Sequence, residues 1–237
     1  AIAGILGYGA VLKKGTALGR DVTLGQLRRD YDAVVLAIGA WKSRALKIPG
    51  EDHPAVLSGI EFLQRVNAHE RVTVGRRTAV IGGGNTALDA ARCSLRCGAD
   101  EVVICYRRTR EEMPASDAEI EEALEEGIRL VELAAPVSIR VEGPALKSLT
   151  LLRMELGEPD ASGRRRPVPV EGSEYDVEVD TVISAVGQYP DTRLLAGTEG
   201  RWLTKQELCR AFERHYPGHI HATGCSFEDR ERGCLGP

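Results

Sequence analysis

Several features that would assign a specialised class are missing from this 237-residue sequence. No apolar run approaches the roughly 20 residues that a membrane-spanning helix needs. No basic segment followed by an apolar one opens the chain, so a secretory signal peptide is not indicated. The formal net charge of −4 is mild, which argues against a nucleic-acid binder. We therefore expect a soluble protein with neither a nucleic acid nor a membrane as its partner.

The six cysteines also lack the spacing of a functional motif. No pair is spaced Cys-x-x-Cys, so neither a dithiol redox pair nor a zinc ribbon is indicated. A reducing, cytoplasmic compartment is the simplest setting for such cysteines. Metal-binding residue types gather near the C-terminus, but their spacing fits no zinc pattern, and we expect no metal there. That group comprises His215, His219, His221 and Cys225.

Short apolar runs that end at glycine predict buried strands of a parallel sheet. They occupy Asp32–Gly39, Thr78–Gly82 and Asp180–Gly187. A predicted helix, Asn85–Cys97, separates the second of these runs from a further strand at Glu101–Tyr106. Strand, glycine turn, helix and strand make one βαβ unit, which is expected to be parallel and right-handed. This alternation predicts an α/β fold.

Other elements are marked by caps and turns. Residues Ser116 and Glu119 form a capping box that opens a helix ending near Glu126, and Ser58–Asn67 has helical spacing. The turn-rich residues 157–169 are expected to join two antiparallel strands, and the run Arg164–Arg166 is interpreted as a solvated loop or hairpin tip. Further strands are expected at Ile128–Leu133, Val137–Val141 and Leu146–Leu156.

Two of the buried runs resemble each other. Tyr31–Gly39 and Val179–Gly187 share Asp, Val, Ala and Gly at matching places. A strand ending in Ala-x-Gly lets the backbone come close to a ligand or to another strand. The match is either chance among Val- and Ile-rich strands or the mark of two nucleotide-binding domains. On the second interpretation, the later copy closes the domain that holds Gly82, and the earlier copy belongs to a domain whose glycine turn lies before Ala1.

Residues 80–87 read Val-Ile-Gly-Gly-Gly-Asn-Thr-Ala and fit the dinucleotide pattern G-x-G-x-x-A. The first glycine permits a tight turn, the third lets a pyrophosphate approach the backbone, and the alanine keeps the helix close to the strand. The helix N-terminus offers free N–H groups and a partial positive charge to the phosphates. The alternatives are a glycine turn without a ligand and another Rossmann ligand such as S-adenosylmethionine. The predicted phosphate-binding residues are Gly82, Gly83, Gly84, Asn85, Thr86 and Ala87.

The end of the second strand indicates NADP(H) rather than NAD(H). NAD sites usually place an acid about 20 residues after the glycines, where it holds the ribose 2′-hydroxyl. Here the strand end reads Tyr-Arg-Arg-Thr-Arg instead. Guanidinium groups form a fork of donors that suits a 2′-phosphate, so Arg107, Arg108 and Arg110 are the predicted ligands. The alternative is a surface cluster of these arginines with Glu111 and Glu112.

Taken together, these segments resemble the small (beta) subunit of NADPH-dependent glutamate synthase and its relatives. Those relatives include the nicotinamide half of dihydropyrimidine dehydrogenase and the large subunit of bifurcating NADH-dependent ferredoxin:NADP oxidoreductase. The resemblance covers most of the chain and is specific in its motifs. The matching segments are Gly19–Leu24, Tyr31–Ala40, Ile48–Asp52, Val80–Arg92, Tyr106–Ser116, Met154–Val170 and Asp180–Asp191.

The resemblance implies a flavoprotein oxidoreductase in which an NADP(H)-binding Rossmann-like domain is inserted in an FAD-type Rossmann domain. It implies that residues 51–200 bind NADP(H), while residues 1–50 and 201–237 form the remnant of the FAD-type domain. Electrons would pass from NADPH to FAD, and through iron–sulfur clusters to the glutamate synthase large subunit or another electron-accepting subunit. Gly187 and Gln188 would lie near the nicotinamide, and Gly39 and Gly224 would line the flavin. No catalytic side chain is expected, because the cofactors carry the chemistry.

The chain departs from this family pattern in three places. The FAD glycine turn and the N-terminal cluster-binding cysteines are absent, and Cys225 stands where the family has an Asp. With Ala1 in place of an initiator methionine, these departures indicate a fragment of a longer protein or a diverged one. FAD is thus expected in the full-length protein, whereas this chain alone is not expected to hold FAD well. The alternative function is a non-catalytic NADP(H)-binding scaffold or sensor that has lost FAD.

Overall fold

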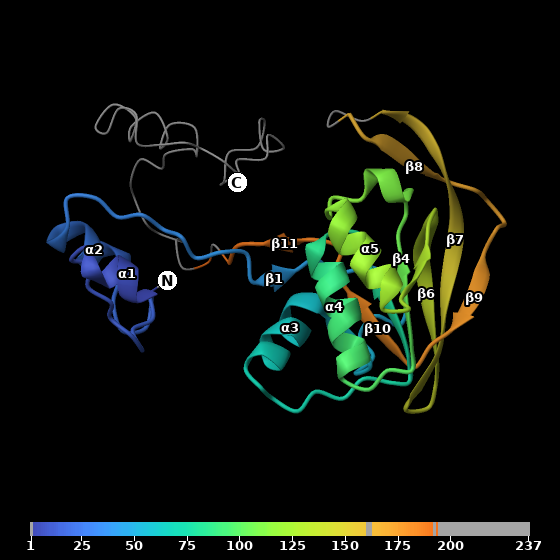
Figure 1. Ribbon diagram of the computed structural model, residues 1–237, viewed down its shortest axis with the longest axis horizontal. Helices are drawn as coiled ribbons and strands as arrows, with labels where there is room; N and C mark the ends of the chain where they lie inside the picture. The colour runs from blue at the N-terminus through green and yellow to red at the C-terminus, as the bar shows by residue number, and fades with distance from the viewer. Residues whose placement is uncertain (1, 160–162, 192, 194–237) are drawn as a thin grey trace. The chain divides into compact units, whose positions relative to one another are not determined.

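The computed structural model describes residues 2–159, 163–191 and 193, and these fall into two units. The first unit contains residues 2–36 and the second contains residues 37–191 (Figure 1). Residues 37–50 thus belong to the second unit, although the sequence placed the boundary at residue 50. One reason is that β1 (Lys42–Ser43) pairs with β11 (Gln188–Tyr189), and another is that Ile139 donates a backbone hydrogen bond to Pro49. An FAD-type domain in residues 1–50 and 201–237 stays a prediction.

The first unit contains two short helices, α1 (Ile2–Gly7) and α2 (Leu24–Asp30). Helix α2 opens with a capping box between Thr23 and Gln26, which explains why it begins there. The predicted buried strand at Asp32–Gly39 is wrong: these residues form no strand, and Val35 is 59% exposed. An apolar run becomes a buried strand only when strands flank it, and none pairs with this run among the described residues.

A five-stranded parallel sheet is the centre of the second unit, and it confirms the predicted α/β fold. Each neighbouring pair is parallel, including the βαβ pair β3–β4, where Ile81 lies opposite Cys105. The last predicted strand, Asp180–Gly187, is present as the shorter, fully buried strand Thr181–Ser184, which lies inside the sheet between two parallel neighbours. The spatial order is β2 (Val56–Ser58), β10 (Thr181–Ser184), β3 (Arg77–Ile81), β4 (Glu101–Cys105) and β5 (Arg129–Val131).

Three helices cover one face of this sheet, and an antiparallel sheet covers the other (Figure 1). The helices are α3 (Gly59–Asn67), α4 (Asn85–Arg96) and α5 (Asp117–Glu125). The predicted caps are confirmed, since Ser58 caps α3 and the Ser116–Glu119 box opens α5. The antiparallel strands are β6 (Ala134–Glu142), β7 (Ala145–Pro159), β8 (Arg165–Pro169) and β9 (Tyr175–Glu178). A 3₁₀ turn, η1 (Arg110–Glu112), lies between β4 and α5.

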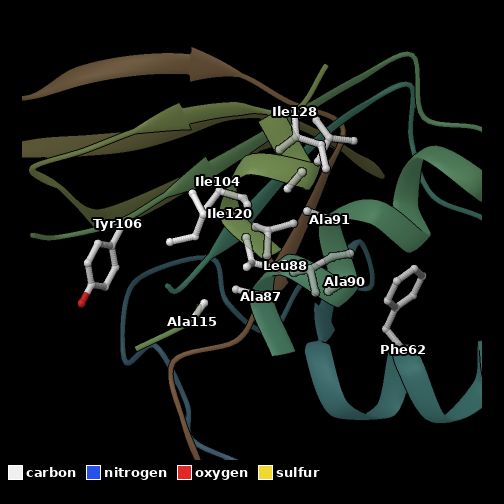
Figure 2. Close-up of a cluster of buried hydrophobic side chains, with 14 of the residues drawn as sticks. Phe62, Ala87, Leu88, Ala90, Ala91, Ile104, Tyr106, Ala115, Ile120 and Ile128 are labelled. Atoms are coloured by element: carbon white, nitrogen blue, oxygen red, sulfur yellow. The ribbon is translucent and has the colours of Figure 1, made fainter. Parts of the chain in front are cut away.

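The alternation of side chains along the parallel strands divides the core into two apolar layers. Val80, Ile104 and Ile183 face the helices, where Leu88 and Ile120 pack against them (Figure 2). The residues between them, including Ala79, Val103 and Val182, face the antiparallel sheet. Full burial of a valine, leucine or isoleucine side chain stabilises the fold by about 1.5–3 kcal/mol. The carboxyl ends of the strands are therefore held by packing on both faces.

In the described part of the chain, no helix has both the length and the apolar character required to cross a bilayer.

Candidate nucleotide-binding site

The glycine turn after β3 has two glycines that the protein itself requires. Gly82 has φ +143°, and a Cβ atom there would lie 2.4 Å from the carbonyl oxygen of Ala185. A Cβ atom on Gly83 would lie 2.6 Å from the ring of Tyr106. Both distances are far inside van der Waals contact, so larger residues at these two positions would displace Ala185, which follows β10, or the ring of Tyr106. The close approach of backbone that the motif predicts is present.

Gly84 is different, because nothing in the described protein requires a glycine there. Its φ of −97° is open to any residue, and the nearest atom to an added Cβ is Pro114 Cγ at 3.7 Å. Gly84 is the N-cap of α4 and supplies no side-chain cap. The backbone N–H groups of Gly84, Asn85 and Thr86 have no acceptor among the described residues. A bare helix N-terminus with free donors and open space above it fits a phosphate group.

The structure brings together two residues that the sequence assigned to different parts of the cofactor, the pyrophosphate and the nicotinamide. The Gln188 side chain, on β11, donates from Nε2 to Thr86 Oγ1 on α4 at 2.9 Å. Gly187 precedes it with φ +123°, and its carbonyl accepts the backbone N–H of Arg44 at 3.0 Å. Residues 102 positions apart therefore meet at the carboxyl edge of the sheet, next to the start of α4. This is the edge at which ligands of open α/β sheets bind.

The three predicted 2′-phosphate ligands differ in their surroundings. Arg107 is exposed, and the described residues offer it neither a hydrogen bond nor an ion pair. Arg108 is only 6% exposed, and its Nε donates to the carbonyl oxygen of Arg165 at 2.7 Å. Arg110 donates to Glu121 at 2.6 Å, which raises the pKa of its guanidinium. Arg107 is therefore the guanidinium best placed to accept a new anionic partner.

Arg107 also lies at the same edge of the sheet as the glycine turn. Strands β3 and β4 are parallel neighbours, and Gly82 donates its N–H to Cys105, two residues before Arg107. The alternative of a cluster with Glu111 and Glu112 does not describe Arg110, whose side chain pairs with Glu121. A guanidinium without an acceptor among the described residues, at the same sheet edge as bare helix N–H groups, is an arrangement suited to an anion with two phosphate centres.

Two neighbours of this site were not assigned to it by the sequence. Tyr106 lies under Gly83, and its hydroxyl donates to the carbonyl of Glu112 at 2.8 Å; Figure 2 shows the ring at the margin of the buried cluster. Glu119 caps α5 as predicted, but its carboxylate also lies 3.5 Å from the amide nitrogen of Asn85. The aromatic residue at the strand end was the only sequence signal for the first. The second depends on how α4 and α5 pack.

The predicted flavin-lining residues remain predictions. Gly39 lies in the second unit with φ +68°, and the indole N–H of the adjacent Trp41 donates to Ile38 at 2.8 Å. Gly224 lies outside the described residues, and so do His215, His219, His221 and Cys225. Ala87, the last residue of the motif, is fully buried against the sheet, as the need for close helix packing predicts.

Comparison with known proteins places this site in a family context. Residues 9–207 match the family described as pyridine nucleotide-disulphide oxidoreductase. The chain is 44% identical over 194 residues to the NADPH-Fe(3+) oxidoreductase subunit beta of Geobacter sulfurreducens, which covers 80% of this chain and 29% of that protein. It is 38% identical over 214 residues to the glutamate synthase [NADPH] small chain of Escherichia coli, which covers 85% and 44%. The resemblance to the glutamate synthase small subunit is confirmed.

Solved structures with the same fold include FprA from Mycobacterium tuberculosis in complex with NADPH. The TM-score is 0.63 at 25% identity, and the alignment covers 73% of this chain and 54% of that one. A thioredoxin reductase from Lactococcus lactis has a TM-score of 0.51 at 20% identity, which supports the fold alone. The chain spans less than half the length of the two curated relatives named above.

Proposed function

Because the chain belongs to the pyridine nucleotide-disulphide oxidoreductase family, we propose that residues 37–191 bind NADPH within a flavin-dependent oxidoreductase. The observation that carries this proposal is the start of α4. There the N–H groups of Gly84, Asn85 and Thr86 find no acceptor among the residues that the structure describes, and these residues also leave the space beside Gly84 open. A pyrophosphate accounts for both features, since it needs donors and room for close approach.

Each end of the nucleotide has its own residues in this proposal. Arg107 binds the 2′-phosphate through its exposed guanidinium, with Arg108 and Arg110 as further ligands or supporting charges. The hydrogen-bonded pair Gln188 and Thr86 lies beside the path from the pyrophosphate to the nicotinamide. Bound NADPH would supply a hydride to a flavin. The contribution of this chain is to bind and orient the cofactor, which is the usual role of protein in hydride transfer.

The rest of the electron path is proposed from the relatives. Glutamate synthase small chain and NADPH-Fe(3+) oxidoreductase subunit beta are both named as subunits that act with NADPH. We propose that the full-length protein holds FAD and passes electrons through iron–sulfur clusters to an electron-accepting subunit. A glutamate synthase large subunit is one such partner. The alternative, a non-catalytic NADP(H)-binding scaffold or sensor, is motivated by Cys225 at the position where the family has Asp.

A titration with both nicotinamide cofactors tests the proposal. Calorimetry of the purified chain is expected to give NADPH a dissociation constant at least tenfold below that of NADH, since one charge-assisted contact is worth about 1.4 kcal/mol or more. Arg107→Glu is expected to abolish this preference by weakening NADPH binding and leaving NADH binding unchanged. Arg71→Glu is the matched control, because Arg71 is exposed and lies in the connection that enters β3 from the opposite edge of the sheet.

Equal affinity for the two cofactors in the wild-type chain would contradict the specificity claim. So would an Arg107→Glu variant with unchanged NADPH affinity. A second measurement separates the two candidate functions: FAD and NADPH are added to the chain and flavin absorbance is followed. Bleaching of the flavin by this chain would exclude the sensor function.

A further inference from the structure

The short loop that carries Arg107 is hydrogen-bonded on both sides to residues 131–134, which run from the end of β5 to the start of β6. Before it, Tyr106 donates its N–H to Val131 and accepts the N–H of Ala134, both at 2.9 Å. After it, the carbonyl of Arg108 accepts the N–H of Leu133 at 3.1 Å. Arg107 is therefore the residue that projects between two anchored neighbours. The direction of its side chain depends on how these anchors are held.

One of the anchors is itself in a constrained conformation. Leu133 has φ +54°, a left-handed value that a leucine rarely adopts. Its N–H bonds Arg108, while its carbonyl accepts the N–H of Met154 on β7 at 2.7 Å. Such outliers persist only where the surrounding structure holds them, and they are frequent at ligand clamps. The loop that carries Arg107 and Arg108 is thus connected through Leu133 to strand β7.

A second connection runs through the hairpin made by β7 and β8. The buried side chain of Arg108 donates from Nε to the carbonyl of Arg165 on β8 at 2.7 Å. Arg165 in turn donates from Nη2 to Leu156 at 2.6 Å and from Nε to Gly157 at 3.2 Å, both on β7. The Arg165 side chain therefore locks β8 onto β7 at the place where its own carbonyl receives Arg108. The basic run at residues 164–166 is more than a solvated tip.

We propose, building on the NADPH function above, that the β7–β8 hairpin determines specificity for the 2′-phosphate and that Arg165 is its positioning residue. Arg165 holds the hairpin, the hairpin carbonyl holds Arg108, and Arg108 with Leu133 holds the backbone from which Arg107 extends. A 2′-phosphate makes its contacts with this loop, whereas a cofactor without that phosphate does not need them. Loss of the Arg165 clamp should consequently weaken NADPH binding and spare NADH binding.

The test compares two neighbouring arginines of the hairpin in the full 237-residue chain. Arg165→Met removes the two donors and keeps the aliphatic length, and it is expected to raise the dissociation constant of NADPH about tenfold while that of NADH stays within about twofold. Arg166→Met removes the same charge one residue later. Arg166 is exposed, and its side chain makes no hydrogen bond or ion pair with the described residues, so both constants should stay within about twofold.

A rescue variant and the comparison of the two cofactors make the outcome decisive. Arg165→Lys keeps the charge and can reach one carbonyl, so its NADPH affinity should lie between those of the wild type and Arg165→Met. Equal losses for NADPH and NADH in Arg165→Met would show a merely structural role and overturn the inference. If Arg165→Met and Arg166→Met lose the same NADPH affinity, the effect comes from long-range charge and not from positioning by Arg165, and the inference is also overturned. If Arg165→Met fails to fold, the Lys variant decides, since full wild-type selectivity there contradicts the proposal.

These results stay separate from a failure of the proposed function. That function is tested by the wild-type preference for NADPH and by Arg107→Glu. If both behave as expected while Arg165→Met keeps its selectivity, only the role of the hairpin is excluded. If the wild-type chain shows no preference, the proposed NADPH function fails first.

Discussion

Replacing Gly84 with alanine should separate ligand binding from folding, because the described part of the chain leaves the space beside this glycine open. An added Cβ would meet no described atom closer than Pro114 Cγ at 3.7 Å, and φ is −97°. Alanine is a poorer N-cap than glycine, which costs about 0.5–1 kcal/mol. Restricting the unfolded chain recovers about 0.4–1 kcal/mol. The net free energy of unfolding should therefore barely change.

Binding should respond much more strongly to the same methyl group. It would occupy the approach of the pyrophosphate to the N–H groups of Gly84, Asn85 and Thr86. Hydrogen bonds to charged groups contribute about 1.5–3 kcal/mol each. Loss of one such bond corresponds to a rise of about 10- to 150-fold in the dissociation constant of NADPH.

The assay is calorimetric titration with NADPH, together with thermal unfolding followed by circular dichroism. The melting temperature of Gly84→Ala should stay within about 3 °C of wild type, since 1 kcal/mol shifts it by about 2–4 °C for a unit of this size. Gly82→Ala is the control, because its Cβ would lie 2.4 Å from the Ala185 carbonyl and should lower the melting temperature markedly. Wild-type NADPH affinity in Gly84→Ala would refute the placement of the pyrophosphate, and a large loss of stability would refute the open space.

Two further predictions concern groups away from the turn. Burial raises the pKa of the Cys105 thiol to about 12, so iodoacetamide at pH 8 should leave Cys105 unmodified in the native chain and modify it after unfolding. Peptide mass spectrometry measures this modification. Labelling of Cys105 in the native chain would contradict its burial. Arg96, and then Arg92, lower the pKa of Glu126 from 4.5 to about 2. The ionised carboxylate therefore stabilises the fold above pH 4.5, and this contribution is lost as the pH falls toward 2. In melting curves recorded across that range, Glu126→Gln should lose less stability than wild type; an identical pH profile would show that the pairs contribute nothing.

Local patterns in the sequence determined the elements around the site. The βαβ unit with its glycine turn, the Ser58 and Ser116 caps and the buried strand that contains Thr181–Ser184 were all predicted and are all present. Each depends on residues close together in the chain, where turn geometry, capping and apolar periodicity act. For the same reason the segment Asp32–Gly39 was predicted wrongly. Its apolar pattern is that of a strand, but strand formation requires neighbours that a local pattern does not supply.

Only the tertiary structure decided which of the predicted residues act together. The motif assigns Gly82 to a tight turn and Gly84 to the approach of a pyrophosphate, but only the fold shows that Gly82 and Gly83 are necessary for packing and that an added Cβ at Gly84 would meet open space. Likewise, three arginines in a row of five residues look equivalent in sequence. Packing of the antiparallel sheet buries Arg108 against Arg165 and leaves Arg107 exposed. Such distinctions arise from contacts between distant segments, since burial and hydrogen-bond partners are set by the whole fold.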